Sequence, residues 1–286
     1  MGYERISSGI GDFERICDKL SIEVPASSPV GRSIVLVKEF IADMQRDAET
    51  AVQKWTKRPF DEWYWSMLSV EKLCSAVSVL EDHCDDLKEL VPLAIAQEIK
   101  QDFEPTQAKT YLYELQIGAW CQQAGFSVTF QEPDVRISGN GLSQQIGFAC
   151  KYPSSEKKLD KRITEGYEQL ERHGVAGLVV VGMDILCCRG MKKFVQFPDS
   201  KEAILGSMTS ELKQWVTKAI SRREGVKGVK NRKPLNGAMF TLSMAGVFGK
   251  PAGLTVASQV TFQSQHDNPL NPDIEIIANA IGRLGS

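Results

Sequence analysis

The chain of 286 residues predicts an α/β fold, in which a mixed sheet is flanked by helices and preceded by a helical N-terminal region. Between residues 33 and 107, apolar residues recur at helical spacing. Residues 110–183 then follow the order helix, three strands, helix, strand. The last of these strands is a continuous apolar run (AGLVVVGM), which is typical of a strand buried on both faces. We therefore expect a helical region at 1–107 and an α/β domain at 108–286.

The N-terminal region divides at its glycines and prolines. Residues 1–32 are polar and rich in Gly, Ser and Pro, which predicts a short helix and a linker. Pro59 and Pro92 are expected to break the helical pattern that follows. Aromatic residues gather near the first break, where few basic residues accompany them, so we expect them to pack between helices rather than to stack on bases. They are Trp55, Phe60, Trp63, Tyr64 and Trp65.

The α/β domain begins with a helix at 111–124, whose apolar residues Leu112, Leu115, Ala119 and Cys121 are expected along one side and which Gly125 ends. A strand at 126–130 and a hairpin follow. The hairpin consists of a strand at 135–137, the turn Ser138-Gly139-Asn140-Gly141 and a returning strand at 145–152. The turn residues are those that tolerate a positive φ, as tight hairpins require.

A helix at 157–173, ended by Gly174, leads to the apolar strand at 176–183. Because this strand returns by a crossover, it should run parallel to the strand that carries Lys151. The rest of the chain predicts a helix at 207–221, strands at 238–248 and 254–262, and a closing helix at 273–284.

Composition narrows the classes of function. The formal net charge of −2 gives no global basic signature, so nucleic-acid binding must depend on local patches. Seven cysteines without a CxxC pair, together with three histidines, argue against a zinc site. The odd cysteine count and the absence of a signal peptide favour a reducing compartment. No apolar run reaches membrane-spanning length. We expect a cytoplasmic protein without membrane contact.

The hairpin carries the residues with the clearest chemistry. Asp134 follows Pro133 at the start of one strand, and Lys151 ends the returning strand. A carboxylate and an amine on adjacent strands can form a site for a divalent cation and a phosphate. Because side chains alternate along a strand, positions 149 and 151 should lie on the same face.

Pro133-Asp134 and Lys151 resemble the signature of the PD-(D/E)xK superfamily, the restriction-endonuclease-like nucleases. The resemblance implies a restriction-endonuclease-like mixed sheet, a Mg²⁺ or Mn²⁺ cofactor, and hydrolytic cleavage inside or at the ends of nucleic acid, with DNA favoured over RNA. It also implies that Asp134 and Glu114 ligate the metal, and that Lys151 and Gln169 take part in catalysis. Nucleases of this kind often act with a separate ATPase or helicase in antiviral defence or DNA processing. The N-terminal helices could dock such a partner.

Position 149, where the superfamily carries Glu or Asp, is Ala149. One interpretation is a natural loss, which leaves a member that does not cut. Another is migration of the acid to the next helix, with Glu165 as the candidate because it stands one turn from Gln169. The third is a deliberate inactivating substitution of Glu. We favour the third, because the surrounding motif is retained. With Ala149, we expect little or no cleavage and weak metal binding.

Two basic clusters are expected to contact phosphates without sequence specificity, although charge runs are usually only solvated faces. The first cluster consists of Lys157, Lys158, Lys161 and Arg162, with Lys157 and Lys158 as the favoured contacts. The second consists of Lys213, Lys218, Arg222, Arg223, Lys227, Lys230, Arg232 and Lys233, with Arg222, Arg223, Lys227, Lys230 and Arg232 as the favoured contacts. The alternative function is a non-catalytic nucleic-acid-binding or scaffold subunit with a degenerate nuclease fold. A third is a helical protein–protein adaptor. No GxxxxGK[ST] or GxSxG motif occurs, which argues against a P-loop ATPase and an α/β-hydrolase.

Overall fold

The computed structural model describes residues 2–55, 57–58, 60–96, 107–188, 201–224, 237–249, 252–264 and 268–285. The chain divides into two compact units. The first comprises Met1–Ala119, Arg189–Gly206 and Ser243–Ala257. The second comprises Trp120–Cys188, Ser207–Leu242 and Ser258–Ser286. The expected domain boundary at residues 107/108 stays a prediction.

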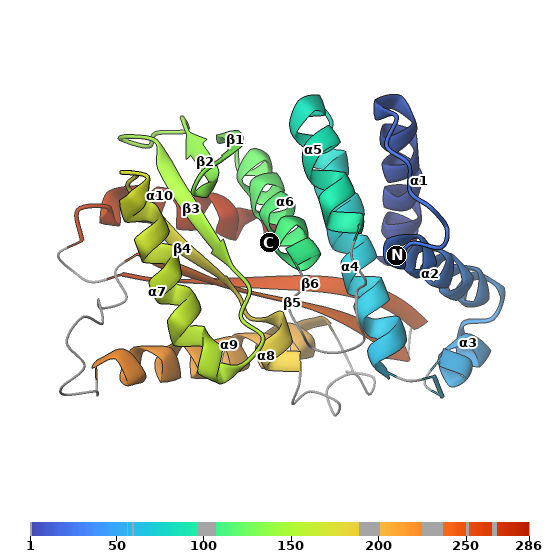
Figure 1. Ribbon diagram of the computed structural model, residues 1–286. Helices are drawn as coiled ribbons and strands as arrows, with labels where there is room; N and C mark the ends of the chain where they lie inside the picture. The colour runs from blue at the N-terminus through green and yellow to red at the C-terminus, as the bar shows by residue number, and fades with distance from the viewer. Residues whose placement is uncertain are drawn as a thin grey trace. The chain divides into compact units, whose positions relative to one another are not determined.

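The first unit confirms the helical N-terminal region. Its helices are α1 (Gly2–Leu20), α2 (Pro29–Arg46), α3 (Ala48–Trp55), α4 (Phe60–Val79) and α5 (Cys84–Ile95). Helices α1 and α2 both pack against α4 (Figure 1). Helix α2 begins where Ser28 accepts a hydrogen bond from the Gly31 N–H and Pro29 supplies a preset φ. Across the α2–α4 contact, the buried Ser33 hydroxyl donates to the Ser66 hydroxyl at 3.1 Å.

Four of the five aromatic residues near the first break pack inside this unit, as expected, while the side chain of Phe60 lies outside the description. Trp55, Trp63, Tyr64 and Trp65 are all buried. The ring of Trp55 meets that of Phe40 edge-on, with the ring centroids 5.2 Å apart. Because these rings are buried, they do not form an exposed platform on which bases could stack.

The break expected at Pro92 was wrong, because Pro92 lies inside α5. Proline removes one backbone hydrogen bond, the one that would run to the carbonyl four residues earlier. Pro92 stands in the last turn of α5, and the helix continues for only three residues beyond it. The chain instead leaves the helical conformation between α4 and α5. Pro59 lies outside the described residues.

A mixed sheet of six strands confirms the predicted α/β class. Its strands lie in the order β1 (Ser127–Gln131), β2 (Asp134–Ser138), β3 (Ile146–Lys151), β4 (Gly177–Gly182), β5 (Ala238–Gly249) and β6 (Ala252–Gln263). Strands β1, β2 and β3 pair antiparallel, whereas β4 runs parallel to both β3 and β5. The expected parallel pairing of the apolar strand with the Lys151 strand is therefore confirmed. That strand, β4, is buried on both faces.

The turn of the β2–β3 hairpin has the positive φ values that its sequence predicts, but the connection runs over residues 139–145 and is longer than the tight turn expected. Gly139, Asn140 and Gly141 have φ values of 79°, 49° and 85°. Such values are costly for most side chains, but glycine and asparagine adopt them readily. The Asn140 side chain also donates a hydrogen bond to the Ala124 carbonyl at 2.8 Å, which ties the turn to the end of the preceding helix.

Helix α7 (Glu156–Arg172) lies along β3 and β4 in the second unit (Figure 1). The approach is closest at Gly166, where an added Cβ would stand 2.6 Å from Cγ1 of Val179. Val179 pairs with Ala149 in the parallel ladder, so the two side chains project from the same face of the sheet. Helix α7 thus covers the face that holds Ala149.

The remaining helices are α6 (Gln107–Gln123), α8 (Asp184–Cys188), α9 (Lys201–Glu224), α10 (Asn271–Gly282) and the short 3₁₀ helix η1 (Arg283–Gly285). Helix α9 begins six residues earlier than predicted. Helix α6 is buried throughout residues 113–119 rather than along one side only. None of the described helices combines the length and the apolar character that a membrane crossing requires.

The closing helix α10 is fastened to the β2–β3 hairpin loop. The buried Asp273 carboxylate, in the first turn of α10, accepts hydrogen bonds from the Ser143 N–H and the Ser143 hydroxyl, each at 2.7 Å. These bonds join segments that lie 130 residues apart in the sequence.

The contact at Gly166 yields the first prediction. Replacing Gly166 with Ala should lower the free energy of unfolding, because the added methyl group meets Val179, and overpacking typically costs about 1–3 kcal/mol. In Gly206→Ala, on α9, the added Cβ meets no atom of the described residues within 4 Å. This control should gain roughly 0.5–1 kcal/mol from helix propensity. Urea unfolding followed by circular dichroism measures both. Equal gains in the two variants would contradict the close approach of α7 to the sheet.

Candidate functional site

Asp134 begins β2 beside the end of β3. Its Oδ2 accepts a hydrogen bond from the Cys150 N–H at 2.6 Å. The carboxylate thus serves as an acceptor for a backbone donor of β3, which fixes its position. The Asp134 side chain is only 15% exposed, so this carboxylate is held largely away from water.

Lys151 and Gln169 meet Asp134 in one cluster. The Lys151 Nζ lies 3.5 Å from Asp134 Oδ2, and it donates to Gln169 Oε1 at 2.5 Å and to the Cys150 carbonyl at 3.1 Å. Gln169 comes from α7, and its Nε2 donates to Asp134 Oδ1 at 2.9 Å. Two strands and one helix therefore supply a carboxylate, an amine and a carboxamide that contact one another.

Ala149 lies within this arrangement. The β2–β3 register pairs Val135 with Phe148, so the next pair places Asp134 opposite Ala149. Residues that face each other in this way have Cβ atoms about 4.5–5.5 Å apart. Ala149 is fully buried. A longer side chain at position 149 would leave the sheet on the Asp134 and Lys151 side, under α7.

Burial raises the pKa of Asp134 above its ordinary value. The Lys151 charge, the Gln169 amide and the Cys150 N–H act in the opposite direction, whereas the nearby Glu132 charge adds to the rise. Desolvation is the largest of these effects, so the one amine beside Asp134 does not fully compensate for the burial of its carboxylate.

The residues present do not fit a divalent metal ion. Among the described residues, no group of three or more His, Cys, Asp or Glu side chains lies together in a way that could hold one. Both oxygens of Asp134 are already engaged by hydrogen-bond donors, and Lys151 places a positive charge beside them. Hard cations require several oxygen ligands. A Mg²⁺ or Mn²⁺ cofactor therefore stays a proposal, and it applies to a site with a carboxylate at position 149.

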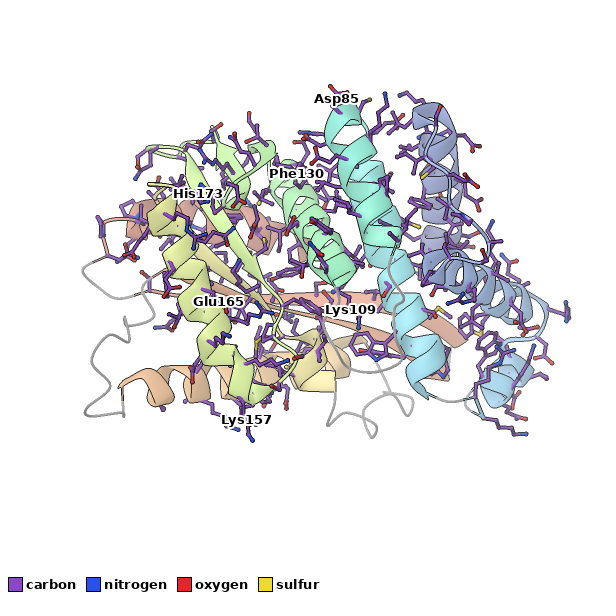
Figure 2. The ribbon with its side chains drawn as sticks, in the orientation of Figure 1. Asp85, Lys109, Phe130, Lys157, Glu165 and His173 are labelled. Atoms are coloured by element: carbon purple, nitrogen blue, oxygen red, sulfur yellow. The ribbon has the colours of Figure 1, made fainter. Side chains whose placement is uncertain are left out.

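Two predicted carboxylates are placed elsewhere. Glu114 is buried on α6, in the part of the chain that belongs to the first unit, and its role as a metal ligand stays a prediction. Glu165, the alternative acid, forms ion pairs on its own helix with Arg162 at 2.8 Å and Lys161 at 3.7 Å. Figure 2 shows Glu165 along α7, between Lys157 at its start and His173 beyond its end.

The two basic clusters differ in how far the structure describes them. Lys157 and Lys158 are exposed in the first turn of α7, and Figure 2 labels Lys157 there. Arg222 and Arg223 lie on α9, but their side chains fall outside the description. Lys227, Lys230 and Arg232 lie outside the described residues altogether. Contact of both clusters with phosphates stays a prediction.

Sequence reasoning missed two residues at the edge of the cluster. Glu132 Oε2 accepts a hydrogen bond from Gln169 Nε2 at 2.9 Å, and it lies 3.3 Å from His173 Nε2. Glu132 directly precedes Pro133-Asp134, so an acid two residues before Asp134 was the available signal. His173 gave no such signal, because only the fold brings the end of α7 next to the β1–β2 turn.

Comparison of the chain with protein-family models, with curated proteins and with solved structures finds no match in any of the three. The functional assignment must therefore come from the site itself.

The second prediction concerns the charge balance of the cluster. In Lys151→Met, the pKa of Asp134 should rise further, because the Lys151 charge is the first of the effects that lower it. A folded-state pKa above the unfolded value, which is about 3.9 for Asp, means that stability is lost as pH rises through the folded pKa. The variant should therefore lose more stability than the parent between pH 4 and pH 7, with a total cost of about 1–3 kcal/mol at pH 7.

Carbon-detected NMR of the Asp134 carboxyl group and urea unfolding across this pH range measure the two effects. Lys161→Met, which removes an exposed lysine of α7, is the matched control and should leave the Asp134 titration unchanged. An unshifted Asp134 titration in Lys151→Met would refute the coupling of the two residues.

Proposed function

We propose that this chain has the active-site framework of a DNA-cleaving nuclease, in a form that Ala149 keeps inactive. One observation carries the proposal: Asp134, Lys151 and Gln169 contact one another, and the register places Ala149 opposite Asp134. Position 149, where the motif has an acid, thus lies next to Asp134, the carboxylate that β2 contributes to the cluster. The order of the elements around it, α6 to β4, is the order that the resemblance implies.

The chemistry of phosphodiester hydrolysis suits these groups. Negative charge develops on the phosphoryl oxygens during attack, and an ammonium group positioned beforehand stabilises it. The Lys151 ammonium is such a group, because three acceptors fix it and its side chain is only 14% exposed. A low exposure strengthens its field at a bound phosphate. A second carboxylate is the component that the site lacks.

The exposed basic residues at the start of α7 support the proposal that the substrate is a polyanion. Lys157, Lys158 and Lys161 are exposed there, and Arg162 follows them. Glu165 offsets part of this charge, since it pairs with Lys161 and Arg162. Lys157 and Lys158 are available to contact phosphates, and such contacts give affinity without sequence specificity.

A second candidate function is a non-catalytic nucleic-acid-binding subunit. The full burial of Ala149 favours it, because an alanine packed at this position belongs to a stable interior rather than to an incomplete ligand set. Both functions predict DNA binding by the parent chain. They differ in the effect of restoring an acid at position 149.

The third prediction concerns DNA binding. The double change Lys157→Glu and Lys158→Glu should weaken binding of a short DNA duplex by at least about tenfold and reduce its salt dependence, because phosphate contacts are lost. Lys88→Glu, which reverses an exposed lysine on α5, is the matched surface control. Fluorescence anisotropy at several salt concentrations gives both quantities. Unchanged affinity and salt slope would remove the start of α7 from the contact surface.

The fourth prediction concerns position 149. Ala149→Glu should create divalent-dependent cleavage of plasmid DNA, because the new carboxylate would face Asp134 and project beside Lys151. The gain should be on the order of a hundredfold or more over the parent, the usual scale for one polar group in such a site. A plasmid-nicking assay with Mg²⁺ or Mn²⁺ measures it.

Two controls make the test specific. Ala149→Gln has nearly the same size without the charge, and it should fold but not cleave. Ala149→Glu combined with Lys151→Ala should be inactive again, because the ammonium is lost. Cleavage by the parent that Glu165→Ala removes would place the acid at Glu165 instead. A folded Ala149→Glu protein without cleavage would favour the binding-subunit function.

A further inference from the structure

The Gln169 carboxamide donates to oxygen atoms of the kind that also bind cations. Its Nε2 lies 2.9 Å from Glu132 Oε2 and 2.9 Å from Asp134 Oδ1, and it also contacts the Pro133 carbonyl oxygen. Three oxygens from three consecutive residues thus surround one NH₂ group. Two carboxylates and a carbonyl are also the ligand types that hard divalent cations prefer.

The other end of the same amide is equally defined. Gln169 Oε1 accepts a hydrogen bond from the Lys151 ammonium at 2.5 Å. If the amide were reversed, its oxygen would face two carboxylates and its NH₂ group would face the ammonium, so electrostatics permit one orientation only. The amide offers two hydrogens to three oxygens, so its hydrogen bonds are shared among them.

From these contacts we propose that, as long as position 149 carries no carboxylate, the Gln169 amide takes the place of a cation and keeps the Glu132, Pro133 and Asp134 oxygens from binding one. The inference rests on the proposed function only in treating the cluster as a nuclease-type centre. A divalent ion would have to displace the neutral amide and then lie near Lys151, which is 3.5 Å from Asp134 Oδ2. The amide binds the same oxygens without adding a positive charge near the Lys151 ammonium.

The fifth prediction tests this blockade with Mn²⁺ as the probe, in calorimetric titrations of the full chain. The parent should show no saturable binding at millimolar Mn²⁺. Gln169→Ala should gain binding, with an association constant at least about tenfold higher, because the three oxygens lose their internal donor. Gln169→Glu should bind more tightly still, since it supplies a further carboxylate in place of the amide.

The double variants Gln169→Ala with Glu132→Ala and Gln169→Ala with Asp134→Ala should return to the parent level, because each removes one of the oxygens. Circular dichroism establishes that every variant is folded. Mn²⁺ binding by the parent as tight as that of Gln169→Ala would overturn the inference. Absence of binding in both folded Gln169 variants would overturn it as well.

This experiment can fail independently of the nuclease assay. If Gln169→Ala gains Mn²⁺ while Ala149→Glu does not cleave DNA, the blockade stands and the proposed function falls. If Ala149→Glu cleaves DNA while neither Gln169 variant gains Mn²⁺, the proposed function stands and the blockade falls.

Discussion

The close packing of α7 on the sheet is the constraint on which the candidate site depends. Gly166 has no side chain, so the helix approaches β4 until its backbone meets Val179. Gln169 stands one turn further along α7 and therefore reaches the strands directly, where it binds Lys151 and Asp134. A larger residue at position 166 would hold the helix away from the sheet, and the carboxamide would withdraw with it. The packing of Gly166 on Val179 thus sets the distances among the polar side chains of Gln169, Lys151 and Asp134.

Local signals predicted much of this fold. The strand at β4 followed from its unbroken apolar run, and the hairpin turn followed from Gly139, Asn140 and Gly141. The direction of β4 followed from the crossover that connects it to β3. The break expected at Pro92 was wrong because a proline is only a local signal, whereas the buried side chains around it, Leu90, Val91 and Ala94, stabilise α5 by packing. Periodicity also understated the burial of α6, because it reports the polarity of residues and not what packs around them.

The candidate site was partly predictable for the same reason. Asp134 and Lys151 lie on paired strands, so their proximity follows from hairpin geometry, and Gln169 follows from the resemblance. Glu132 and His173 depend on where the end of α7 meets the β1–β2 turn, which no spacing in the sequence specifies. Orientation was equally hidden. No spacing in the chain indicates that the Gln169 amide binds the Glu132 and Asp134 carboxylates at once.

The clasp between Asp273 and Ser143 has a consequence for how the chain is made. Synthesis proceeds from the N-terminus, so the hairpin that carries Lys151 leaves the ribosome long before the carboxylate that holds its loop. Until α10 emerges, the Ser143 N–H and hydroxyl lack the carboxylate that both of them bind in the folded chain. Closing a contact across 130 residues costs more chain entropy than forming the hairpin, and it is therefore slower. The strands can therefore pair early on the ribosome, while the final shape of the loop beside them must wait for the last helix.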